Sequence, residues 1–485
     1  MHPKLLLVAG LSASSLVAAA DGSERVLGVY LFHRHGDRTA KAWKPVNLTA
    51  LGATEVYSSG SFYRSRYVAA SAPAASRIAG LSADTAVLSQ LEVTAPKDAV
   101  LEGSALVFLQ GLYPPTGSAG VETLANGSKV EAPLGGYQYV PVDALADAAS
   151  SAKSEDNAWL QGGSGCGNAV VSSNTYFTSA AYKETYDDSR DFYQRLLPVI
   201  NGTYGADAAN FKNGYAVFDL INVATIHNAS IPASNLLDNS TRARLYDLAS
   251  VQEWNLAYNS SEPVRAIAGS VLAGQVLAAL QDVVDAKASA PKFNAQFGAY
   301  GTFMAFFGLA QLPAASPDFY GICDYASSMA FELVTSVADA KPKPEDVSVR
   351  FLFANGTAAE KGLKAFPLFG QSKDTLSWTD FKAGMGKFAI ADTKHWCTLC
   401  GNTNGQCAAG NSTSSDGGAT AQNTDGSGSG VSRPVAGVIG ALVTLVVILG
   451  LQAAVMLFGG LRLVKKSTLA GARRGVETSE AGVKS

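Results

Sequence analysis

The chain has 485 residues, of which 47% are hydrophobic and 16% charged, so it can bury a large core and is neither a small disulfide scaffold nor a disordered protein. The net charge of −3 includes a basic C-terminal segment, where six Lys and Arg face two Glu after residue 461. The body before that segment is therefore acidic, which argues against nucleic acid as a partner.

The leader, residues 1–20, predicts a cleaved secretory signal peptide. It has one basic residue, Lys4, followed by an apolar stretch and a small-residue exit at residues 18–20. The rest of the chain then enters the secretory lumen, where Asn-x-Ser/Thr sequons are candidates for glycosylation. The sequons are at Asn47, Asn126, Asn201, Asn228, Asn239, Asn259, Asn355 and Asn411.

A buried strand, a polar loop and a helix are predicted near the start of the body. Residues 26–32 (VLGVYLF) are mostly β-branched or aromatic, which is typical of a buried strand. Thr49 offers an N-cap, and apolar residues recur at roughly helical spacing from Leu51 to Tyr67. Because ligands of open α/β sheets bind beyond the carboxyl ends of such strands, we expect a functional site in the loop.

That loop, residues 33–39 (HRHGDRT), carries the groups that phosphoryl chemistry needs. Arg34 and Arg38 provide planar forks for phosphate oxygens, and His35 provides a nitrogen nucleophile. A hydrogen bond on the other ring nitrogen would keep His35 neutral and reactive at about pH 5 to 7. The loop therefore predicts hydrolysis of a phosphate ester, with neither cofactor nor metal required.

The sequence Arg-His-Gly-Asp-Arg-Thr after an apolar strand resembles the signature of the histidine acid phosphatases. That branch of the phosphoglycerate-mutase-like superfamily includes prostatic-type acid phosphatases and phytases. Residues 48–52, 104–115 and 226–228 are similar to further stretches of the family, and the resemblance covers about residues 25–390. The arrangement of the C-terminal region most resembles a membrane-anchored branch seen among fungi.

The resemblance implies both a fold and residue roles. The expected fold is α/β, with a central mixed sheet flanked by helices and a smaller, mainly helical domain inserted at about residues 130–290. By resemblance, His35 forms a phosphohistidine, while Arg34 and Arg38 bind the phosphate.

Two positions depart from the family pattern. The family's third phosphate-binding Arg precedes a Ser-Ala pair, but here the stretch before Ser104 offers only Lys97, which lacks the planar fork of Arg. The family's His-Asp pair, which protonates the leaving alcohol, is replaced by Tyr300 and Gly301. Tyr300 is thus the candidate proton donor, although a phenol with a pKa of about 10 is poorly matched to acidic pH.

Other proton donors stay open. His395 could fold back over the site, and Asp37 or another carboxylate could serve. Without a general acid, esters with poor leaving groups would react about 10² to 10⁴ times more slowly, while activated aryl esters would be spared. His33 is expected to pack beside the loop, and neither His33 nor His227 is given a role.

The body contains the cysteines Cys166, Cys323, Cys397, Cys400 and Cys407. In an oxidising compartment they predict two disulfides and one leftover thiol, with the pairing left open. A zinc site is the alternative, since His395 and the last three cysteines supply four ligand types that zinc accepts. Disulfides are favoured because secreted thiols usually oxidise.

The C-terminal region predicts a membrane anchor behind the body, residues 21–407. Residues 408–434 are mostly small or polar and predict a flexible stalk. Residues 435–461 contain no charged residue and are long enough for a transmembrane helix with the lipid bilayer as partner. The basic tail, 462–485, belongs in the cytoplasm by the positive-inside rule. We expect a single-pass type I protein at the cell surface with its body outside the cytoplasm.

Two functions are compatible with the sequence. In the first, the chain is a membrane-anchored acid phosphatase that hydrolyses phosphate monoesters of small molecules through His35. In the second, it is a catalytically impaired member that binds phosphate esters or acts as a structural surface glycoprotein, because Tyr300 and Gly301 replace the His-Asp pair. The presence of Arg34, His35 and Arg38 together favours the first.

Overall fold

A computed structural model describes residues 24–145, 165–339, 341–403 and 407. The predicted signal peptide, stalk, transmembrane helix and tail all lie outside these residues, as does the sequon at Asn411.

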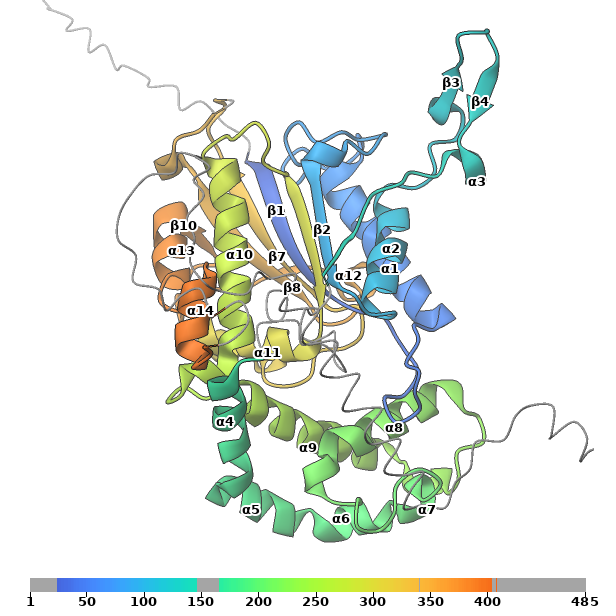
Figure 1. The fold of residues 1–485 in the computed structure, drawn as a ribbon, viewed down its shortest axis with the longest axis vertical. Coiled ribbons are helices and arrows are strands. Elements are labelled where there is room, and N and C mark those ends of the chain that lie inside the picture. The colour runs from blue at the N-terminus through green and yellow to red at the C-terminus, as the bar shows by residue number, and fades with distance from the viewer. Residues whose placement is uncertain (1–23, 146–164, 340, 404–406, 408–485) are drawn as a thin grey trace, which may run out of the picture. The chain divides into compact units, whose positions relative to one another are not determined.

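A mixed β-sheet forms the centre of the fold, as expected (Figure 1). Its strands are β1 (Arg25–Arg34), β2 (Leu91–Pro96), β5 (Asp143–Leu145), β6 (Phe293–Gly298), β7 (Ser328–Thr335), β8 (Ser348–Ala354), β9 (Lys364–Ala365) and β10 (Thr375–Ser377). The order is β10-β8-β7-β1-β6-β2-β5, with β9 paired to β8. From β1 to β5 the neighbours are parallel, and from β1 to β10 they are antiparallel. Separately, β3 (Val121–Thr123) and β4 (Lys129–Glu131) form a two-stranded sheet that precedes the short helix α3 (Pro133–Gly136).

Side chains of β1 alternate between two hydrophobic cores, as strand geometry dictates. Val29 and Leu31 lie in the core covered by α1 (Ala50–Tyr63), α2 (Leu101–Leu112) and α12 (Ala358–Lys361). Tyr30 and Phe32 lie in the core covered by α10 (Ile267–Val284), α11 (Tyr300–Leu309) and α13 (Trp378–Met385). Both faces of the strand are thus buried, which explains its unbroken apolar sequence.

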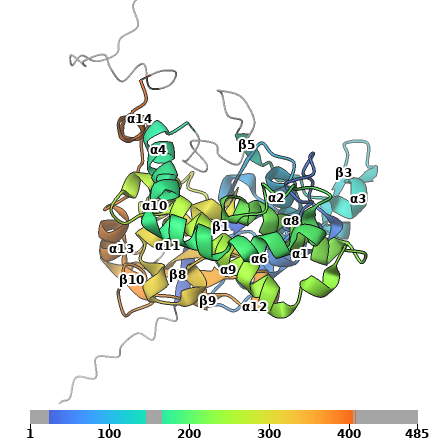
Figure 2. The same ribbon diagram turned by 90° about the horizontal axis from the view of Figure 1, so that it is seen from below.

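A layer of helices covers the carboxyl end of β1 in both views (Figures 1 and 2). It consists of α4 (Gly167–Thr175), α5 (Ala180–Asp188), α6 (Arg190–Arg195), α7 (Leu197–Ile200), α8 (Gly214–His227) and α9 (Asn239–Ala257). These helices fall within the segment 130–290 that was expected as an insertion. Strand β5 of that segment pairs with β2 in the main sheet, and α10 packs on β1 and α11.

Helix α10 also has a membrane-like composition. Within the described part of the chain, the helical stretch Pro263–Val284 alone is both long and apolar enough to cross a bilayer. More than half of it is buried, against α11 and β1 among others, which is typical of a core helix.

The cysteines form two disulfides, Cys166–Cys400 and Cys397–Cys407, and leave Cys323 as a buried thiol. This confirms the expected two bridges and one leftover thiol. Both bridges involve α14 (Thr393–Cys400), and one of them joins it to the N-cap of α4. The alternative zinc site has no thiol left, since its three cysteines are oxidised. His395 is exposed on α14, and the structure does not place it with the loop after β1.

Candidate active site

Hydrogen bonds from neighbouring elements fix the loop that follows β1. The carbonyl of His35 accepts a hydrogen bond from the Ala326 N–H at 2.9 Å. The N–H of Asp37 donates to the Glu55 carboxylate of α1 at 2.7 Å. Burial is the largest of the causes that raise the pKa of Glu55 to about 7. The loop is therefore held at the carboxyl end of β1, where the sequence predicted a site.

Two glycines let this loop lie directly on α1. A Cβ added at Gly36 would overlap the carbonyl of Gly52, and one added at Gly52 would overlap the carbonyl of Asp37. The predicted N-cap is confirmed, since the Thr49 hydroxyl accepts a hydrogen bond from the Gly52 N–H at 3.0 Å. Because the atoms nearest to each added Cβ belong to the backbone, a larger side chain at either position would have to displace the loop or the helix.

Gly36→Ala is expected to lower the free energy of unfolding by about 1 to 3 kcal/mol and to reduce any hydrolysis of p-nitrophenyl phosphate, since overpacking must displace the loop. Chemical denaturation and p-nitrophenyl phosphate assays on the purified variant would test this. Gly103→Ala in α2 is the control, because its new Cβ would meet only Leu48 at 3.8 Å. Equal stability of the two variants would contradict the close approach.

His35 has a fixed tautomer. Its Nδ1 donates to the Gly36 carbonyl oxygen at 2.8 Å, which leaves Nε2 with its lone pair when the ring is neutral. Burial, and then the charges of Arg34 and Arg38, lower the pKa of His35 well below its ordinary value, with Lys41 acting in the same direction. The neutral ring, the form that can attack phosphorus, is therefore favoured.

Arg34 lies close to two tyrosine rings. Its guanidinium carbon is 4.6 Å from the ring centre of Tyr325 and 5.3 Å from that of Tyr300. Its Nη1 donates to the Cys323 carbonyl oxygen. The ring of Tyr325 also lies 5.6 Å from that of His35. These rings hold the planar guanidinium in one orientation beside the imidazole.

Arg38 is 1% exposed and forms a buried ion pair with the inserted layer. Its Nη2 lies 2.7 Å from Oδ1 of Asp219 in α8, and it donates to the Tyr215 hydroxyl at 3.1 Å. Asp219 also accepts a hydrogen bond from the Lys41 N–H at 2.8 Å. The inserted helices thus supply one wall of the site and brace the loop.

The third cation near His35 is Lys41. Its Nζ is 5.3 Å from the ring centre of Tyr215 and 5.7 Å from that of Tyr300. The expected third phosphate ligand, Lys97, is instead exposed just after β2, and the structure does not place it with these residues. Lys41 lies two positions after the Arg-His-Gly-Asp-Arg-Thr motif. Its charge and its position near the loop are the only features of the sequence that could have indicated a role in the site.

Tyr300 stands where the resemblance placed the proton donor. It begins α11 directly after β6, whose Gly298 is the register partner of Arg34. The Tyr300 hydroxyl donates to the Glu253 carboxylate of α9 at 2.8 Å. Burial raises the pKa of Tyr300 well above its ordinary value, and Glu253 and Tyr215 add to the rise. The phenol is therefore neutral and in contact with a carboxylate that the sequence did not reveal.

Asp37 braces the loop. It is fully buried, and its carboxylate accepts hydrogen bonds from the Thr49 hydroxyl and from His227 Nε2, the latter at 2.6 Å. His227 ends α8, so this contact is a second tie between the inserted helices and the loop. Because the Asp37 carboxylate already accepts these two hydrogen bonds, it stabilises the loop and is less suitable as the proton donor.

His33 packs as expected. Its ring centre is 5.3 Å from that of Phe108 and 5.1 Å from that of Phe297. Burial lowers the pKa of His33 to about 4, so the ring is neutral and acts as part of the core.

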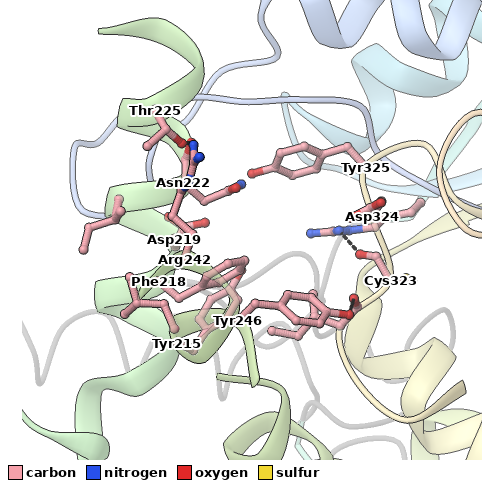
Figure 3. A pocket seen from close by; sticks show the side chains of 14 residues that line it. Tyr215, Phe218, Asp219, Asn222, Thr225, Arg242, Tyr246, Cys323, Asp324 and Tyr325 are labelled. Carbon is pink, nitrogen blue, oxygen red and sulfur yellow. Dashed lines mark hydrogen bonds between the residues drawn. The ribbon is translucent and has the colours of Figure 1, made fainter. Parts of the chain in front are cut away.

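A cavity of about 190 Å³ opens beside Arg34 (Figure 3). Helices α8 and α9 form one wall, and residues 322–325 form the other. Four aromatic side chains line it, namely Tyr215, Phe218, Tyr246 and Tyr325. The cavity can therefore receive the organic part of a ligand whose phosphate lies on Arg34.

Comparison with known proteins identifies the family and the fold of the chain. Residues 41–354 match the family model of the histidine phosphatase superfamily (branch 2). A search of the curated proteins finds no match.

Three phytases are among the similar solved structures. The phytase of Klebsiella sp ASR1 is 13% identical, with 76% of this chain and 95% of that chain covered and a TM-score of 0.51. The Citrobacter braakii phytase is 12% identical, with 78% and 99% covered and a TM-score of 0.51. The Hafnia alvei phytase in complex with myo-inositol hexakis sulphate is 12% identical, with 79% and 99% covered and a TM-score of 0.50. At these identities the likeness shows the fold alone. With the family model matching well over half of its residues, the chain belongs to the histidine phosphatase superfamily, branch 2.

Proposed function

We propose that this chain is a membrane-anchored acid phosphatase of the secretory pathway that hydrolyses phosphate monoesters through a phosphohistidine on His35. The hydrogen bond from His35 Nδ1 to the Gly36 carbonyl carries the proposal, since it presents Nε2 as a nucleophile. Membership of the family supports hydrolysis of phosphate esters in general.

The reaction has two steps. Nε2 of His35 attacks phosphorus, and the bond to the ester oxygen breaks, so that the alcohol leaves and a phosphohistidine remains. Water then attacks the phosphohistidine and releases phosphate. Arg34, Arg38 and Lys41 supply positive charge for the transferred phosphoryl group, whose oxygens carry negative charge throughout.

Trapping of the intermediate tests the proposal. The secreted body is mixed rapidly with an excess of radiolabelled p-nitrophenyl phosphate and quenched during the first turnover in alkali, which preserves phosphohistidine. We expect a burst of p-nitrophenol and an acid-labile label on His35. Phosphate binding without label or turnover would instead support the catalytically impaired alternative.

The pH dependence follows from the environment of His35. Protonation of its Nε2 would remove the nucleophile, and the lowered pKa moves that protonation to more acidic pH. The acid limb of kcat/KM for p-nitrophenyl phosphate, which reports on the free enzyme, is therefore expected well below pH 6.5. A limb at or above that value would contradict a histidine buried between cations.

The secretory location and the anchor are supported by the sequence and by the exposed sequons. Five of them have an exposed asparagine, namely Asn47, Asn126, Asn201, Asn228 and Asn239, whereas Asn259 and Asn355 are half-buried. Full-length protein should resist alkaline extraction from membranes and shift in mobility after endoglycosidase treatment. A chain that ends at residue 430 should be secreted. Recovery of the full-length protein in the soluble fraction would contradict the anchor.

A further inference from the structure

A chain of polar side chains leads from the phosphate-binding loop to a carboxylate on α9. Arg38 donates to the Tyr215 hydroxyl at 3.1 Å. The rings of Tyr215 and Tyr300 lie 5.0 Å apart, and a hydrogen bond between the two side chains contributes to the raised pKa of Tyr300. The Tyr300 hydroxyl in turn donates to Glu253 at 2.8 Å. Three separate elements, α8, α11 and α9, thus bring two phenols and a carboxylate together.

This chain ends where a leaving alcohol would lie. Tyr215 lines the cavity beside Arg34, and its hydroxyl accepts a hydrogen bond from Arg38, so the hydroxyl lies next to a residue proposed to bind the phosphoryl group. The other end, Glu253, is half-buried behind Tyr300. A proton held on Glu253 can therefore pass to the ester oxygen by way of the two hydroxyl groups.

We infer that Glu253, Tyr300 and Tyr215 form a proton relay that takes the place of the His-Asp pair in protonating the leaving alcohol. The inference rests on the proposed phosphohistidine reaction. Tyr215 is the group that meets the substrate, and Tyr300 and Glu253 act through it.

The proton transfers balance. As the bond between phosphorus and the ester oxygen breaks, the oxygen keeps the bonding pair and takes the Tyr215 proton. Tyr215 takes the proton of Tyr300, and Tyr300 takes that of a protonated Glu253, so both phenols end neutral and Glu253 ends as a carboxylate. When water attacks the phosphohistidine, its proton returns along the same path to Glu253. The hydrogen bond from Tyr300 to Glu253 in the structure corresponds to the state with Glu253 ionised.

The surrounding charges suit such a relay. Negative charge that develops on the Tyr215 oxygen faces Arg38, and the Lys41 ammonium lies 5.3 Å from the Tyr215 ring and 5.7 Å from the Tyr300 ring. The Arg34 guanidinium lies 5.3 Å from the ring centre of Tyr300. The nearby carboxylate of Asp219 forms an ion pair with Arg38. A phenol flanked by cations can pass a proton without a long-lived tyrosinate.

The leaving group tests the relay. Nitrophenolate leaves as a stable anion and needs little protonation, whereas glycerol 2-phosphate has an alkoxide to protonate. Glu253→Gln, which can still accept the Tyr300 hydrogen bond but supplies no proton, is expected to lower kcat on glycerol 2-phosphate by about 10² to 10⁴-fold. Its kcat on p-nitrophenyl phosphate should fall much less. Tyr300→Phe should show the same selective loss, whereas Tyr215→Phe, which also removes a hydrogen-bond acceptor of Arg38, should lower both activities but the alkyl activity more.

Tyr246→Phe is the matched control. Tyr246 lines the same cavity, but its hydroxyl donates to the Ile322 carbonyl and lies outside the relay. It should affect both esters alike. Phosphohistidine formed from p-nitrophenyl phosphate shows in every variant that the loop is intact.

Two results would overturn the inference, and they distinguish failure of the relay from failure of the proposed phosphatase reaction. If Glu253→Gln still forms phosphohistidine but its ratio of alkyl to aryl activity equals that of the unmutated protein, the relay is wrong and the proposed phosphatase stands. If the unmutated protein forms no phosphohistidine from either ester, the phosphatase and the relay fall together.

Discussion

His35→Ala is expected to lower the hydrolysis of p-nitrophenyl phosphate by on the order of 10⁴-fold or more, because the attacking nitrogen itself is removed. Arg34 and Arg38 remain in this variant, so phosphate should still bind and raise the thermal unfolding temperature. Steady-state rates, phosphoenzyme trapping and a thermal shift with inorganic phosphate measure the three effects. Together they separate lost chemistry from a lost binding site.

His395→Ala is the matched control, since His395 is exposed on α14. Its activity should equal that of the unmutated protein, which would also remove His395 as a proton donor. Residual turnover in His35→Ala within tenfold of the unmutated rate would mean that phosphate transfer uses another nucleophile or direct attack by water.

Asp219→Ala is expected to destabilise the body by about 3 to 5 kcal/mol, because it leaves the charge of Arg38 buried without its partner. Burial disfavours that charge, but Tyr215 and Asp219 raise the pKa of Arg38 above its ordinary value. The guanidinium therefore stays protonated. Asp219 also holds the Lys41 backbone, so activity should fall with stability. Denaturant unfolding with paired activity assays gives both numbers.

The surface pair Arg190–Asp187 provides the comparison. Both side chains are exposed, and their Nη2 and Oδ1 atoms are 2.7 Å apart, the same separation as in the buried pair. Asp187→Ala should cost no more than about 1 kcal/mol. Similar losses at the two positions would show that Asp219 contributes no more than a surface partner.

The strand, the loop and the helix after it could be predicted because their signals are local. The apolar run of β1, the N-cap Thr49 and the cations of the loop lie within about 40 residues, and the rule for strand ends places the loop at a site. Gly36 shows the same principle, since its lack of a side chain is required by a neighbour only 16 positions away in sequence.

The walls of the site could not be predicted, because they form by packing between distant segments. Asp219 and Glu253 belong to helices whose own sequences carry no motif for a site, and the placement of α8 and α9 over the sheet brings them to Arg38 and Tyr300. For the same reason the sequence presented Tyr300 as an isolated phenol. The resemblance predicted the place of the proton donor, and the fold reveals its neighbour.

The two disulfides define how the body would bear load. Tension applied to the chain beyond Cys407 would pass through the Cys397–Cys407 bridge and bypass the residues between them. From α14 the force divides, one share following the backbone toward α13 and the other crossing the Cys166–Cys400 bridge to α4. The loop that carries His35 lies on neither route. If the protein is tethered as proposed, a force on the body would act first on α14 and its two disulfides. The loop that carries His35 would bear little of that force.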